Sequence, residues 1–122
     1  MPRAALLLLV LLAACADARV LAVPIDLDGA TRARAEAAAA ARLGDPSSAV
    51  FDGLTGHALA DGTVLACGAM RGRDSFGFDW GFAPVAVRLR GAEVLRVHVD
   101  DSTGYGPATI ACTHAAEGLA HG

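Results

Sequence analysis

Few residues of this chain have the types and spacing that catalysis requires. Ser75, His98 and Asp100 are the residue types of a serine hydrolase triad, and His98 and Asp100 alternate onto one face of an expected strand. No G-x-S-x-G turn surrounds Ser75, so nothing in the sequence presents it as a nucleophile. We therefore expect no enzymatic activity, and an envelope hydrolase is the least favoured function.

Metal binding is the second chemistry that the sequence could offer. Cys112 and His114 lie close together, and His121 follows in the tail. They lack the tight cysteine or histidine spacing from which zinc sites are built. We expect neither a metal nor any other cofactor.

The start of the chain has the features of an export signal. A positively charged Arg3 is followed by an apolar run over residues 4–12, which is too short to cross a bilayer as a helix. Next, Leu12-Ala13-Ala14-Cys15 resembles the lipobox of bacterial lipoproteins. The resemblance implies that residues 1–14 are removed as a signal peptide, and that Cys15 carries the lipid that fastens the protein to a membrane.

Two versions of this export remain open. Ala16 is not the aspartate that favours retention at the inner membrane, so the resemblance favours the outer membrane, with the protein facing the periplasm. Cleavage after Ala16-Asp17-Ala18 is the alternative, and it would release a soluble periplasmic or secreted protein.

Cys67 and Cys112 remain as a pair after either form of processing. In an oxidising compartment they are expected to form a disulfide that closes a loop of about 45 residues. Their wide separation favours a structural bridge over a redox site, which needs a close pair.

The segment after Cys67 gathers aromatic and charged residues. We favour the interpretation that Phe76, Phe78 and Trp80, spaced two apart, lie on one face of a strand and fill the core. The alternative is an interaction surface, because aromatic residues and arginine are enriched at protein interfaces. Its residues would be Arg71, Arg73, Asp74, Phe76, Phe78 and Trp80.

The elements that must position these residues can be outlined from the pattern. Residues 30–43 are rich in alanine and predict a helix with Asp28 as its N-cap. Residues 50–54, 62–70, 82–90 and 93–99 predict strands, the last two joined as a hairpin by Gly91-Ala92. The sequence thus predicts an α+β fold: one N-terminal helix on an antiparallel sheet of about four strands, with one disulfide.

Charge excludes one class of partner. The chain has ten arginines, no lysine and a net charge of −3, and the arginines are dispersed. A nucleic-acid-binding surface requires a concentrated basic patch, so we expect no nucleic acid partner.

Part of the chain resembles an uncharacterised family of small bacterial secreted proteins. The resemblance rests on Asp45-Pro46-Ser47-Ser48-Ala49-Val50-Phe51, on Cys67-Gly68, and on the loop step Ser75-Phe76-Gly77. It implies a fold and an envelope location but no reaction.

These observations together predict residues 1–14 as signal, 15–28 as tether and 29–122 as one domain. The expected function is a non-catalytic binding or structural component of the cell envelope, with another envelope protein as its partner. The alternative is a secreted inhibitor or small-ligand-binding module.

Overall fold

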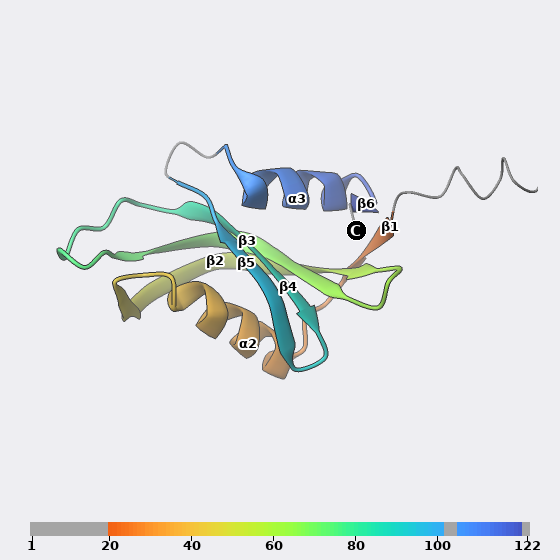
Figure 1. Ribbon diagram of the computed structural model, residues 1–122, viewed down its shortest axis with the longest axis horizontal. Helices are drawn as coiled ribbons and strands as arrows, with labels where there is room; N and C mark the ends of the chain where they lie inside the picture. Colours follow the sequence, from red (N-terminus) through yellow and green to blue (C-terminus); the bar gives the residue numbers. More distant parts are fainter. Residues whose placement is uncertain (1–19, 102–104, 121–122) are drawn as a thin grey trace, which may run out of the picture.

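One curled antiparallel sheet forms the centre of the protein. The computed structural model describes residues 20–101 and 105–120. In this part of the chain six strands pair in the order β5-β4-β3-β2-β1-β6. They are β1 (Val20–Ile25), β2 (Asp45–Leu59), β3 (Val64–Arg73), β4 (Ala83–Arg90), β5 (Glu93–Val99) and β6 (Leu119–Ala120). The helices α2 (Gly29–Ala40) and α3 (Pro107–Ala116) lie on opposite sides of this sheet (Figure 1).

The predicted α+β fold, with one N-terminal helix on about four strands, is wrong. The described chain is mostly β, with six strands and two short helices. Residues 20–25, which the sequence placed in the tether, form β1 and pair with β2 from Ala22 opposite Leu59 to Ile25 opposite Gly56. Pro24 is tolerated because β6 pairs only with Val20 and Leu21, so Pro24 lies where β1 has no outer neighbour.

The second helix, α3, was also not predicted from the sequence. Proline is favoured in the first turn of a helix, and Pro107 occupies that position in α3. Four alanines favour a helix in this segment, but the threonines, isoleucine and cysteine between them have weak helix propensity. Gly106, at the N-cap position, has no side chain to mark the helix start, so the local signal is incomplete.

The first helix and the last hairpin were predicted correctly. Asp28 caps α2 by accepting a hydrogen bond of 2.7 Å from the backbone N–H of Thr31. β4 and β5 pair as expected, and Gly91 has φ of 57° in the turn between them.

Both helices pack on the sheet through small side chains. On one face, Ala35 and Ala39 of α2 pack on a cluster that includes Val85 and Val87 of β4. On the other face, Ala108 and Ala115 of α3 pack on a cluster that includes Leu65, Cys67 and Ala86. Residues of β4 therefore alternate between the two helices, as the period of a strand requires.

The disulfide ties α3 to the centre of the sheet. The predicted bridge between Cys67 of β3 and Cys112 of α3 is confirmed, with a Cα to Cα distance of 5.9 Å. Because β3 pairs with β2 on one side and β4 on the other, the helix is attached to an inner strand of the sheet.

Asp100 holds the beginning of the same helix. Its buried carboxylate accepts hydrogen bonds from the backbone N–H groups of Ala108 and Thr109, both at 2.8 Å, and from the Thr109 hydroxyl at 2.6 Å. A Cβ at Gly106 would lie 2.6 Å from Asp100 Oδ1, so only glycine leaves room for this approach. Burial raises the pKa of Asp100, but the hydrogen bonds from Thr109 and Ala108 outweigh it and lower the pKa overall.

Removing the disulfide should destabilise the protein substantially. Replacing Cys67 and Cys112 by alanine should lower the free energy of unfolding by about 4 kcal/mol, because the unfolded chain regains the freedom of the closed loop. Urea denaturation of the exported protein measures this, with reduced wild type as a second comparison. A double variant as stable as the oxidised wild type would contradict the assigned role.

Asp100→Asn should lower the free energy of unfolding by about 1–3 kcal/mol at neutral pH, because an amide cannot accept all three hydrogen bonds. The carboxyl group is more acidic in the folded state, so its contribution is complete above its unfolded pKa. The contribution is lost as pH falls through the folded pKa. Denaturation across this acid range should therefore show the two proteins converging. Asp52→Asn, at an exposed carboxylate, is the control.

Candidate functional site

The hairpin between β3 and β4 is the candidate site. Arg73 and Asp79 form the last bridge between its arms, and residues 74–78 make the turn. We call residues 71–82 the aromatic hairpin. Four large side chains on it are exposed, with exposed fractions of 86% for Phe76, 63% for Phe78, 72% for Trp80 and 44% for Phe82.

The prediction that Phe76, Phe78 and Trp80 fill the core is wrong. The turn extends beyond the part of the sheet that α2 and α3 cover, and in Figure 1 it projects at the far left. Gly77 and Gly81 have φ of 85° and 88°, so the backbone turns at positions where an alternating strand would continue. No residue from 74 to 82 belongs to either core cluster of the described chain.

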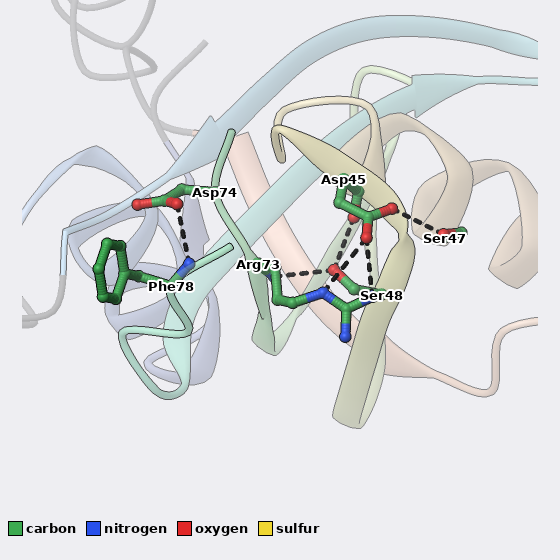
Figure 2. Close-up of polar contacts among 6 residues, drawn as sticks. All are labelled: Asp45, Ser47, Ser48, Arg73, Asp74 and Phe78. Carbon is green, nitrogen blue, oxygen red and sulfur yellow. Dashed lines mark hydrogen bonds and ion pairs between the residues drawn. The ribbon is translucent and has the colours of Figure 1, made fainter. Parts of the chain in front are cut away.

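Asp74 holds the turn of the hairpin. Its Oδ1 accepts hydrogen bonds from the backbone N–H groups of Phe76, at 2.8 Å, and Phe78, at 3.0 Å. Its Oδ2 accepts one of 2.9 Å from the indole Nε1 of Trp80. The bond from Trp80, followed by that from Phe78, lowers the pKa of Asp74. One carboxylate therefore fixes both the backbone and one aromatic side chain of the tip (Figure 2 draws its contact with Phe78).

The base of the hairpin is joined to the start of β2. Figure 2 shows Arg73 and Asp45 paired, with Arg73 Nη2 2.8 Å from Asp45 Oδ2. The Ser48 hydroxyl accepts a 2.7 Å hydrogen bond from the Arg73 backbone N–H and donates one of 2.6 Å to the Asp45 carbonyl. Ser47 donates to the Asp45 carboxylate at 2.7 Å. The bonds from Ser47 and Arg73 lower the pKa of Asp45.

The second arginine of the hairpin is also paired. Arg71 Nε donates to Asp79 Oδ2 at 2.9 Å, and the guanidinium lies 5.4 Å from the centre of the Phe82 ring. Phe78 and Trp80 lie beside one another, with ring centres 6.5 Å apart. The hairpin thus exposes apolar rings while the charges of Arg71 and Arg73 are each balanced by an aspartate.

The structure brings together the six residues of the predicted interaction surface. Arg71, Arg73, Asp74, Phe76, Phe78 and Trp80 all lie on this hairpin. Sequence reasoning missed the part played by Asp45 and Ser48, which are distant in sequence. The one signal was the D-P-S-S segment, whose serines and aspartate are typical of side chains that bond nearby backbone.

The other predicted residues are distributed elsewhere. Cys15 lies outside the described residues. Ser75 lies in the hairpin turn, whereas His98 pairs with Ala86 in the middle of β4, and the Asp100 carboxylate is occupied by α3. Within the described ranges no cluster of three or more potential metal ligands occurs.

Comparison with models of protein families, with curated proteins and with solved structures returned no match. Between residues 20 and 120, as far as they are described, no helix has the length and apolar character needed to cross a bilayer.

Asp74→Ala should loosen the aromatic hairpin without unfolding the domain, because it removes three hydrogen bonds at a turn outside both cores. Trp80 is the single tryptophan, so its fluorescence reports the change directly. Acidifying the wild type should produce the same shift, and only below the usual pKa of an aspartate, since the pKa of Asp74 is lowered. Asp52→Asn should leave the emission unchanged. An identical spectrum for Asp74→Ala would show that the carboxylate does not order the tip.

Proposed function

We propose that this protein is a non-catalytic component of the bacterial cell envelope, tethered by a lipid on Cys15, that binds another envelope protein through its aromatic hairpin. The observation that carries the proposal is the exposure of Phe76, Phe78, Trp80 and Phe82 on one hairpin. The chain has only six aromatic residues, and four of them are placed here, in contact with water. Exposed apolar side chains gathered in this way mark binding surfaces.

The order of the hairpin supports binding. Binding to a flexible loop costs the conformational entropy that the loop loses when it becomes ordered. In this protein Asp74 already fixes the turn and the Trp80 indole, so the cost is smaller. Rigid aromatic anchors surrounded by satisfied polar groups are typical of the residues that dominate protein interfaces.

Two features favour a protein partner over a lipid surface. Anionic membranes attract unpaired basic residues, but Arg71 and Arg73 are each paired with an aspartate. The hairpin and the start of β1 also lie at opposite ends of the sheet, because Ala22 pairs near the β2–β3 turn and Arg73 pairs with Asp45 at the other end of β2 (Figure 1). A tether that enters at β1 would therefore direct the hairpin away from the membrane that holds it.

Site-specific photocrosslinking in cells of the native host tests this proposal. A photoreactive residue at Phe76 or Trp80 should give the same discrete protein adduct, since both side chains are exposed on one hairpin. With the probe at Phe76, the further change Trp80→Ala should reduce the adduct about tenfold, as expected for an anchor residue. Glu93, exposed in the β4–β5 hairpin, is the control position and should give no adduct.

Three outcomes would reject the proposal. They are adducts with phospholipid in place of protein, the same adduct from the probe at Glu93, or no discrete adduct from either hairpin position.

A further inference from the structure

A cavity lies beneath α3, on the face of the sheet opposite to α2. Its volume is about 360 Å³, which is within the range of small-molecule sites. Most of its wall is apolar and comes from the sheet and from α3: Leu59, Leu65, Ala86, Pro107, Ile110, Ala111 and Ala120. The opposed alanines are the reason for the space, because a larger residue at Ala86 or Ala111 would occupy it.

The polar residues at this cavity are all basic. Arg88, Arg96, His98 and His114 line it, and no acidic residue does so. In a chain whose net charge is −3, this concentration of basic groups contrasts with the composition as a whole. Such a lining complements a negatively charged group and disfavours a positive one.

Strand register places two of these charges directly opposite each other. Arg88 of β4 pairs with Arg96 of β5, and like charges in this arrangement destabilise a sheet. Arg88 is balanced by Asp61, with Nη2 and Oδ2 2.7 Å apart. Arg96 has no hydrogen bond or ion pair with any described residue. An anion bound beside Arg96 would therefore relieve a repulsion present in the free protein.

The positive region extends past the cavity mouth. A shallower hollow of about 220 Å³ shares Arg88 and Arg96 with the cavity and adds Arg90. Asp61 is the single acidic residue that lines this hollow, so three arginines face one aspartate. A headgroup placed here would meet a net positive surface while its attached tail lay against the apolar wall.

We propose that this cavity binds a single-chain amphiphile with an anionic headgroup, its apolar tail under α3 and its carboxylate or phosphate beside Arg96. The tail requirement follows from the apolar wall, and the sign of the headgroup follows from the basic rim. The site shares no residue with the aromatic hairpin, so either proposal can be rejected without affecting the other.

Calorimetric titration with four ligands that have similar apolar chains and differ in headgroup tests this proposal. The mature chain, residues 15–122 with Cys15→Ser, is used with its disulfide formed, so that no leader, acyl chain or detergent competes. Decanoate should bind more tightly than decanol, and decyltrimethylammonium should not bind. Decyl phosphate is the fourth ligand, and the tighter of the two anions identifies the headgroup. Equal binding of decanoate and decanol, preference for the cation, or no binding of either anion would overturn the proposal.

Variants separate the tail from the headgroup. Arg96→Gln should weaken decanoate binding about tenfold, the effect of losing one charged hydrogen bond, and leave decanol binding unchanged. Ala111→Leu should fill the cavity and weaken both ligands. Ile110→Glu, at a rim residue that is 48% exposed and so tolerant of substitution, should weaken only the anions. Arg34→Gln, on α2 across the sheet, is the matched control. Equal losses from Arg34→Gln and Arg96→Gln, or unchanged decanoate binding in both Arg96→Gln and Ile110→Glu, would reject the assigned site.

Discussion

The close approach of both helices to the sheet through small side chains is the constraint from which the other features follow. Ala35 and Ala39 of α2 and Ala108 and Ala115 of α3 are almost fully buried against strands that themselves contribute Ala66 and Ala86. Small residues bury little apolar area each, so a domain of this size gains much from a covalent bridge. The small side chains also leave space beneath α3, and the aromatic rings of residues 76–82 lie outside both cores.

Aspartate side chains hold several segments that lie outside the two cores. Asp28 and Asp100 accept hydrogen bonds from the first turns of α2 and α3, Asp74 orders the hairpin turn, and Asp61 pairs with Arg88. In each case the pKa of the carboxyl group is lowered, because the ionised form is the better hydrogen-bond acceptor. A side chain this short keeps its carboxylate near the backbone, which suits it to helix ends and turns. Ionised aspartates therefore hold several turns and helix ends of the described chain.

Sequence patterns predicted those parts whose signals are local. The alanine-rich helix, the hairpin turning at Gly91 and the disulfide each depend on a short pattern or on the number of cysteines. β1 was missed because its pairing with β2 joins residues more than thirty positions apart, and α3 was missed because Asp100 supplies its cap from seven residues before Pro107. The composition of the candidate site was predictable, but the exposure of Trp80 was not. Aromatic residues spaced two apart are typical of a strand with one face in the core. The exposure of Trp80 depends on which part of the sheet the helices cover, and the local sequence does not show this.

The separation of the hairpin tip from both core clusters has a consequence for evolution. Residues 74–82 contribute no buried side chain to either cluster, so substitutions among their exposed rings remove little of the packing that keeps the domain folded. Asp74 and the two turning glycines preserve the loop shape whatever rings it displays. The exposed rings can therefore change during evolution, and with them the partner that is bound, while the sequence of the scaffold changes little. Loops on a rigid frame acquire new specificities in this way.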